Sequence, residues 1–182
     1  MDHGSVDQAP EVLLSRHEIE QRVGDLAAEI AQDYQGRTPH LIGILKGAWV
    51  FMADLIRHMD IDVTVDFLGI TSYGSGTHSS GEVKITKDLD TSIEGREVLI
   101  VEDILDTGRT LKYLKEILSA HKPHNLRVVT LLDKRSRRVV PVTADYVGFE
   151  IADIFVVGYG LDLDQKYRQL PDIHVLRTEH SF

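Results

Sequence analysis

The stretch VLIVEDILDTGRTL, residues 98–111, decides the fold class and directs attention to one possible site. Its first four residues are apolar and are typical of a buried strand. Two acids, Glu102 and Asp103, follow them directly, and Asp106 opens the turn Asp-Thr-Gly three residues later. Apolar residues at helical spacing come next. The stretch therefore predicts a strand that runs through acidic residues and a turn into a helix.

Strand and helix patterns alternate along the rest of the chain. Ser15 and Glu18 form a capping box, and apolar residues at helical spacing follow it. The other expected elements are strands over 41–45 and 61–70, a helix over 47–59, a strand over 98–101, a helix over 108–120, a strand over 126–132 and two strands within 146–160. This alternation predicts an α/β fold with a central, mostly parallel sheet flanked by helices.

Length and composition limit the possible functions. The 182 residues, 42 % of them apolar, suit one domain over 1–182. Residues 1–10 are polar, which predicts a loose arm and not a secretory signal, and no run is long enough to span a membrane. The absence of cysteine excludes disulfides and thiolate chemistry and fits a cytoplasmic protein. The net charge of −9, with one short basic cluster at 134–138, argues against a nucleic-acid partner.

Charged residues follow several of the expected strands. In a parallel sheet the carboxyl ends of the strands meet at one edge, and ligands bind beyond that edge. The residues expected there are Lys46, Gly47, Glu102, Asp103, Asp106, Asp133, Lys134, Asp162 and Arg168. Any one of them is as well explained as a solvated loop residue or a helix cap. The ordered set favours a polar site on an apolar scaffold.

The turn Asp106–Thr110 has the chemistry of a phosphate site. Two threonine hydroxyls flank Gly108, which lets the backbone approach a ligand closely. The helix that starts here offers free N–H groups and the positive end of its dipole to an anion. Glu102 and Asp103 would repel phosphate, so they suit a ribose diol or a Mg²⁺ ion that bridges the anions.

The stretch TSYGSGTHSSGE, residues 71–82, is rich in glycine and serine and lacks apolar residues that would order it. A loop of this length in a small domain is usually functional or disordered. We therefore expect residues 71–82 to be a mobile loop.

Other families share parts of this pattern but fit it less well. A receiver domain opens with such an acidic strand end, whereas 97 residues precede Val98 here. An aspartic protease carries Asp-Thr-Gly in an all-β fold. No GxGxxG motif opens a helix, and no GxxxxGK[ST] motif occurs, so the common dinucleotide and nucleotide cradles are absent.

The stretch 98–111 resembles the phosphoribosyl diphosphate motif of the type I phosphoribosyltransferases. Further segments resemble the branch of that family that acts on hypoxanthine, or on hypoxanthine and guanine: LKG (45–47), TSYGSGT (71–77), LLDKRSRR (131–138), YVGFEIADIFVVGYGLD (146–162) and YRQLP (167–171). The resemblance covers roughly residues 11–178. It implies the type I phosphoribosyltransferase fold, with a small hood and a flexible lid over residues 71–82.

The resemblance also implies a reaction. A 6-oxopurine base takes the phosphoribosyl group from 5-phosphoribosyl 1-diphosphate, diphosphate leaves, and a purine nucleoside 5′-monophosphate forms. This is purine salvage, and it requires Mg²⁺. Relatives form dimers and tetramers, so we expect a homodimer or homotetramer.

Each matching position acquires a role by this resemblance. The 5′-phosphate would lie in the loop Asp106, Thr107, Gly108, Arg109 and Thr110, with Arg109 contributing only its backbone N–H. Asp106 has a second candidate role as general acid or base at purine N7. The ribose hydroxyls would meet Glu102 and Asp103, and Mg²⁺ would be held near Glu102, Asp103 and Asp162.

The remaining roles concern the leaving group and the base. Diphosphate would bind to Lys46, Gly47 and Arg168, under a lid closed by Ser72 and Tyr73. The purine would contact Lys134, Phe155, Val156 and Asp162, with Lys134 donating to O6 and Phe155 stacking on the ring. The resemblance further implies a cis peptide between Leu45 and Lys46.

Two alternatives remain open at this stage. Some members of this fold are regulators that bind RNA or DNA, although they would need a basic face. The alternative enzyme is a phosphoribosyltransferase whose main substrate is xanthine or another base. It stays open because contacts to the C2 substituent of the purine are not visible in a sequence.

Overall fold

The computed structural model describes residues 11–72 and 83–176 of the chain. The expected loose arm, residues 1–10, lies outside the described residues, as does the larger part of the expected lid, residues 73–82.

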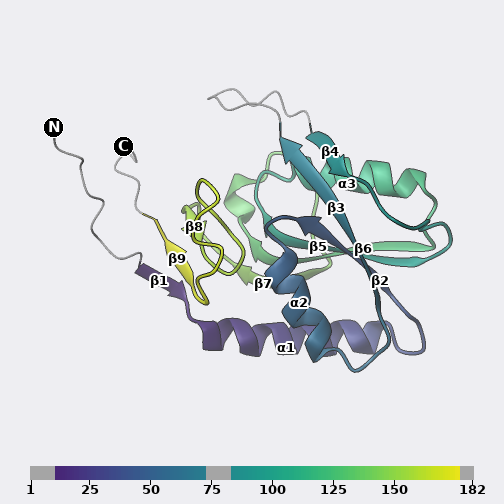
Figure 1. Ribbon diagram of the computed structural model, residues 1–182, viewed down its shortest axis with the longest axis horizontal. Helices are drawn as coiled ribbons and strands as arrows, with labels where there is room; N and C mark the ends of the chain where they lie inside the picture. Colours follow the sequence, from purple (N-terminus) through teal and green to yellow (C-terminus); the bar gives the residue numbers. More distant parts are fainter. Residues whose placement is uncertain (1–10, 73–82, 177–182) are drawn as a thin grey trace.

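The described residues form alternating strands and helices, as Figure 1 shows. In chain order they are β1 (Glu11–Leu14), α1 (Arg16–Asp33), β2 (His40–Leu45), α2 (Trp49–His58), β3 (Thr64–Ser72), β4 (Val83–Lys87), β5 (Glu97–Leu105), α3 (Arg109–Ala120), β6 (Asn125–Asp133), the 3-10 turn η1 (Arg135–Arg137), β7 (Tyr146–Glu150), β8 (Val156–Val157) and β9 (Ile173–Val175). The predicted α/β fold is confirmed.

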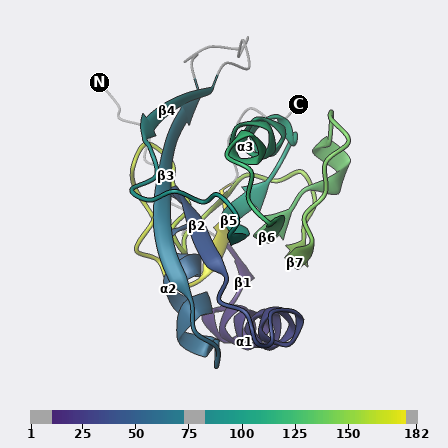
Figure 2. The same cartoon turned by 90° about the vertical axis from the view of Figure 1, so that its right-hand side faces the viewer.

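The main sheet has the strand order β4-β3-β2-β5-β6-β7 within the described residues. Neighbouring strands from β3 to β7 are parallel, and β4 pairs antiparallel with β3 at one edge. Helices α1 and α2 cover one face of the sheet, and α3 covers the other (Figure 2). The carboxyl ends of the parallel strands consequently point to one common edge.

The apolar run of β5 is continuous because both faces of this central strand are covered. Leu99 and Val101 pack in a core with α1 and α2. Val98 and Ile100 pack in a second core with α3. All four side chains are fully buried. Strands of parallel sheets carry such unbroken apolar runs for this reason.

Helix α1 begins as the sequence predicts. The Ser15 hydroxyl accepts from the backbone N–H of Glu18, and the Glu18 carboxylate accepts from the backbone N–H of Ser15 at 2.8 Å. The reciprocal pair satisfies two of the N–H groups that a helix start leaves free.

A second, small sheet lies beside the main one in the order β1-β9-β8 (Figure 1, left). It joins the start of the described chain to its end, because β1 pairs antiparallel with β9. This sheet corresponds to the expected small hood. Strands β1, β4 and β9 were not predicted, since each is short and lies where no helix–strand alternation marks it.

The bounds of strands β3 and β5 differ from the prediction. Strand β3 begins at Thr64 and runs to Ser72, so residues 61–63 are not in the strand and residues 71–72 belong to it. Those two residues pair with β4 and therefore do not begin the loop. Strand β5 continues to Leu105, four residues beyond the predicted end at Val101.

Candidate active site

A cavity of about 280 Å³ opens at the carboxyl edge of the sheet. Its lining combines the turn after β2, the end of β5 and the start of α3. The lining residues that the sequence singled out are Gly47, Glu102, Asp103, Asp106, Thr107, Gly108 and Thr110. Arg109 is exposed and does not line the cavity.

The loop before α3 is shaped for an anion. Gly108 is the N-cap residue with a φ of 85° and has no side chain that could cap the helix, and the Arg109 N–H makes only a long contact of 3.5 Å with Thr107 Oγ1. A Cβ on Gly108 would lie 2.6 Å from Val142 Cγ2, so both the backbone conformation and the packing require glycine. The uncapped N–H groups and the helix dipole are therefore available to a phosphate.

Glu102 and Asp103 lie inside β5, not after it as predicted. Pairing of β2 with β5 ends at Val101, whereas β6 continues to pair with β5 as far as Leu105. One side of the strand is thus released from the sheet at the point where the acids begin. The strand holds their carboxylates on a rigid backbone.

Burial controls the charge of these two acids. It raises the pKa of Glu102 well above its usual value, and the neighbouring charge of Asp103 raises it further. Burial also raises the pKa of Asp103 to about 6, although the backbone N–H of Ile104 and the charge of Arg168 oppose this rise. A buried carboxylate beside a partly buried one is unfavourable without a cation. The pair is therefore suited to a ligand that brings positive charge.

The turn after β2 lies against one of these acids, Asp103. The peptide bond between Leu45 and Lys46 is cis, as the family resemblance implied. Gly47 packs against the Asp103 carboxylate, and Gly160 packs against the carbonyl oxygen of Gly47.

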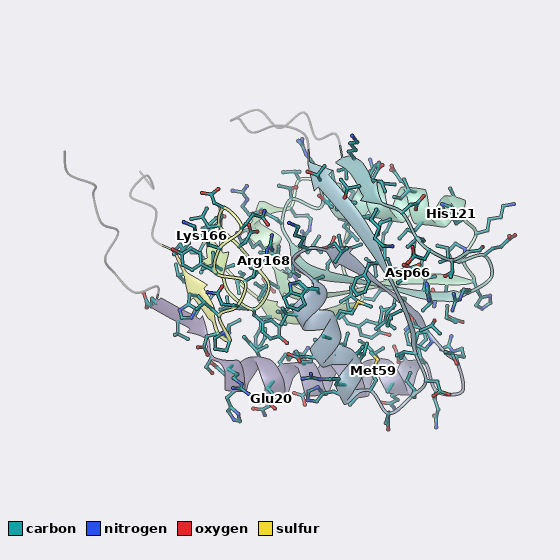
Figure 3. All side chains as sticks on the ribbon, viewed as in Figure 1. Glu20, Met59, Asp66, His121, Lys166 and Arg168 are labelled. Atoms are coloured by element: carbon teal, nitrogen blue, oxygen red, sulfur yellow. The ribbon has the colours of Figure 1, made fainter. Side chains whose placement is uncertain are left out.

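The predicted diphosphate residues Lys46 and Arg168 lie together. Gln165 Oε1 accepts from Lys46 Nζ at 3.1 Å and from Arg168 Nη2 at 3.2 Å. Arg168 also pairs with Asp162 at 3.1 Å and donates to the carbonyl oxygen of Gly160 at 2.7 Å. Arg168, labelled in Figure 3, lies where the C-terminal segment meets the central part of the molecule. Gln165, which the sequence did not single out, holds the two cations side by side.

The predicted purine residues are less completely assembled. Lys134 is buried, and its Nζ lies 4.0 Å from Asp153 Oδ1. Val156 is buried in β8, whereas Phe155 beside it is 43 % exposed. None of these three residues lines the cavity. Asp162, the fourth predicted purine residue, pairs with Arg168, which is one of the predicted diphosphate-binding residues. The exposed Phe155 ring is free to take a stacking partner.

Asp106 has a partner that the sequence did not predict. Arg137 Nε donates to Asp106 Oδ1 at 3.0 Å, and Arg137 Nη1 donates to Asp153 Oδ2 at 3.2 Å. The basic cluster 134–138 is therefore ion-paired and is not a free basic surface. No local signal links these residues, because Asp106 and Arg137 are brought together by the pairing of β5 with β6.

By themselves, the acids of this site do not make up a complete set of metal ligands. Over residues 11–72 and 83–176, no three His, Cys, Asp or Glu side chains form a group that would hold a metal ion. The charge of Asp162 nevertheless reaches Asp103 and raises its pKa. An oxygen-only set with few carboxylates fits Mg²⁺, which takes its other ligands from water and substrate.

Among the described helices, none combines the length and apolar character needed to cross a membrane.

The fold and the loop before α3 define a phosphoribosyltransferase. Residues 11–164 match the family model described as the phosphoribosyl transferase domain. The chain is 55 % identical to a hypoxanthine-guanine phosphoribosyltransferase of Bacillus subtilis (strain 168), over 91 % of this chain and 92 % of that protein. It is 48 % identical to the enzyme of the same name from Streptococcus thermophilus (strain CNRZ 1066), over 92 % and 93 %.

Solved structures agree with these sequence matches. A crystal structure of a hypoxanthine phosphoribosyltransferase from Staphylococcus aureus superposes with a TM-score of 0.89, at 48 % identity, over 97 % of both chains. A hypoxanthine-guanine phosphoribosyltransferase from Bacillus anthracis gives a TM-score of 0.89 at 47 % identity, over 93 % of this chain and all of that one. The chain belongs to the hypoxanthine-guanine phosphoribosyltransferase family, and the family predicted from its sequence is confirmed.

Proposed function

We propose that this chain transfers the 5-phosphoribosyl group from 5-phosphoribosyl 1-diphosphate to N9 of hypoxanthine, and also of guanine. The products are inosine or guanosine 5′-monophosphate and diphosphate. Membership in the family makes the chain an enzyme of purine salvage. The observation that carries the proposal is that one cavity joins the helix start at Gly108 to Glu102, Asp103 and the turn at Gly47.

The donor is expected to lie along this cavity. Its 5′-phosphate accepts from N–H groups and hydroxyls of the loop Asp106, Thr107, Gly108, Arg109 and Thr110. Its ribose hydroxyls donate to Glu102 and Asp103. Its diphosphate binds to Lys46, Gly47 and Arg168, where negative charge builds as the C1–O bond breaks.

Mg²⁺ is the proposed cofactor, held near Glu102, Asp103 and Asp162. When bound, it neutralises the charge of the leaving diphosphate. The buried acid pair supports this assignment, because burial and like charge make it unfavourable without a cation. Asp162 is expected to contact the ion through a water molecule.

The base is expected to enter between Asp106 and the segment of β8. Phe155 stacks on the ring, the Val156 backbone meets its edge, and Lys134 donates to O6. As N9 forms its bond to C1, the proton on N7 passes to the Asp106 carboxylate, which acts as general base. Asp106 lines the donor cavity, and among the described residues only Oδ1 of its carboxylate accepts a hydrogen bond.

Ser72 and Tyr73 are proposed to close over the diphosphate and exclude water from the reacting C1. Tyr73 lies outside the described residues, and Ser72 is the last residue of β3. The lid thus rests on the sequence pattern of residues 71–82 and on the family resemblance.

Further proposals concern the protein as a whole. We propose one phosphoribosyltransferase domain over 1–182, located in the cytoplasm, and a homodimer or homotetramer. Xanthine is the second candidate base. The choice of base depends on contacts to the C2 substituent, which would come partly from backbone atoms near Val156 and Asp162.

The test is turnover with 5-phosphoribosyl 1-diphosphate and each of hypoxanthine, guanine, xanthine and adenine, with and without Mg²⁺. We expect Mg²⁺-dependent formation of nucleotide from hypoxanthine and guanine. Turnover with xanthine alone would favour the second candidate. Folded protein that turns over none of the four bases would contradict the proposal.

A further inference from the structure

Four charged side chains alternate in sign behind the base site. Arg137 stands between Asp106, at 3.0 Å, and Asp153, at 3.2 Å. The other oxygen of Asp153, Oδ1, lies 4.0 Å from Lys134 Nζ. The row therefore runs Asp106, Arg137, Asp153, Lys134.

The two ends of this row are the residues that the proposed function assigns to one edge of the purine. Asp106 is to take the proton of N7, and Lys134 is to donate to O6. These two purine atoms are neighbours on the ring. Arg137 and Asp153, the two middle members, have no assigned contact with substrate, yet they connect the two groups that do.

Arg137 holds one carboxylate oxygen of Asp106 and leaves the other available to act as a general base. It occupies Oδ1, whereas Oδ2 accepts no hydrogen bond within residues 11–72 and 83–176. The carboxylates of Asp153 and Asp106 raise the pKa of Arg137. One oxygen of Asp106 is thus fixed while the other remains available.

Other charges also face Asp106. Arg138 Nη1 donates to the backbone oxygen of Asp106, from the same segment as Arg137. Glu102 and Asp103, from β5, line the same cavity as Asp106 and bring like charge to it. Among the described residues, Arg137 is the only cation that pairs with the Asp106 carboxylate. It therefore offsets the two acids.

We infer that Arg137 is a positioning residue that keeps the Asp106 carboxylate aimed at N7, and that Asp153 ties this pair to Lys134. The inference rests on the proposed function, because it concerns the base step of that reaction. It adds residues that the reaction alone does not assign.

The test compares Arg137→Met with Arg135→Met. Arg135 belongs to the same turn but pairs with Asp133 at 3.5 Å and Glu150 at 3.4 Å, so it is a matched control. For hypoxanthine we expect Arg137→Met to lower kcat about fivefold, the scale of a partly exposed ion pair. We expect the acidic limb of its pH–rate profile to differ from that of the wild type and of Arg135→Met. KM for 5-phosphoribosyl 1-diphosphate should stay unchanged.

A further variant, Arg137→Lys, separates charge from structure. Lysine keeps the positive charge without the planar fork that spans two carboxylates. It should restore the acidic limb and only part of kcat. Arg135→Met should match the wild-type enzyme in both.

Two results are decisive against the inference. If the wild-type enzyme is active, Asp106→Asn is strongly impaired, and Arg137→Met equals Arg135→Met in kcat and acidic limb, the inference alone is wrong. If Asp106→Asn keeps full activity, the proposed role of Asp106 is wrong, and the role of Arg137 falls with it.

Discussion

A Cβ atom on Gly47 would lie 1.6 Å from Oδ2 of Asp103. The turn after β2 therefore packs its backbone directly on an acid of β5. A Cβ on Gly160 would likewise lie 2.4 Å from the carbonyl oxygen of Gly47. Three segments that are far apart in the sequence are thus in close contact at the proposed leaving-group site, and two glycines make that contact possible.

Gly47→Ala is expected to disable the enzyme. The added methyl group must displace the Asp103 side chain or the turn that carries Lys46, and a shift of about 1 Å near reacting groups can cost about 100-fold in rate. Steady-state kcat/KM for 5-phosphoribosyl 1-diphosphate measures the loss. The matched control is Gly24→Ala in α1, where the nearest atom to the new Cβ is 3.6 Å away. The control should keep wild-type activity; normal activity in Gly47→Ala would refute the packing argument.

Gly108→Ala is expected to weaken binding of the 5′-phosphate. Alanine in the left-handed region costs about 1 kcal/mol or more, and here the new methyl group also meets Val142 Cγ2 at 2.6 Å. Gly36→Ala is the control, because Gly36 has a φ of 74° but nothing within 4 Å of its Cβ position. Titration of inosine 5′-monophosphate by calorimetry should show weaker binding in Gly108→Ala only. Equal affinity in both variants would argue against this loop as the phosphate site.

Asp103→Asn is expected to stabilise the metal-free protein and to lower its activity. The pKa of Asp103 is raised from 3.8 to about 6. Between these values the folded state keeps a proton that the unfolded chain has released, so stability falls as pH rises, and the cost remains above pH 6. Removing it should add of the order of 1–3 kcal/mol at pH 8 and little at pH 4.

Urea unfolding without Mg²⁺ at both pH values measures this effect, with exposed Asp25→Asn as control. Turnover at a series of Mg²⁺ concentrations measures the second effect. A variant that is less stable at pH 8 and equally active would contradict the assignment of Asp103.

His40→Gln is expected to flatten the acid side of the stability profile. His40 is buried, its Nδ1 pairs with Thr64 Oγ1 at 2.8 Å, and its Nε2 has no hydrogen-bond partner within residues 11–72 and 83–176. Burial lowers the pKa of His40 below 6.5. As pH falls below 6.5 the unfolded chain takes up a proton that the folded state does not, so wild-type stability falls, with a slope of at most about 1.4 kcal/mol per pH unit.

Denaturant unfolding between pH 7 and pH 5 tests the role of His40. The slope should be smaller in His40→Gln than in the wild type, and unchanged in His121→Gln, whose side chain is exposed. Identical slopes in all three proteins would show that His40 does not control this acid response.

The sequence predicted those parts of the fold that repeat a local pattern. The run Val98–Val101, the capping box at Ser15 and the helix after Gly108 each carry their signal within a few residues. Strands β1, β4 and β9 carry no such signal, because two of them exist only through pairing of the chain's ends and the third only at a sheet edge. The end of β5 was missed since pairing with β6, and not residue type, extends that strand to Leu105.

The site residues likewise divide into those with a signal in the sequence and those that depend on long-range contacts. Residues at the strand ends, such as Lys46 and Asp106, were found because parallel strands bring their ends together. Gln165 and Arg137 were not found. Each acts through a long-range contact, Gln165 with Lys46 and Arg137 with Asp106, that depends on the folded loops.

The most direct test of the central claim is the rate of nucleotide formation from hypoxanthine by Asp106→Asn, beside the wild type and Asp25→Asn. The account predicts active wild-type and Asp25→Asn proteins and a loss of about 100-fold or more in kcat for Asp106→Asn, the scale of a missing general base. Near-normal kcat in Asp106→Asn would contradict the claim that this loop both binds the phosphate and accepts the proton.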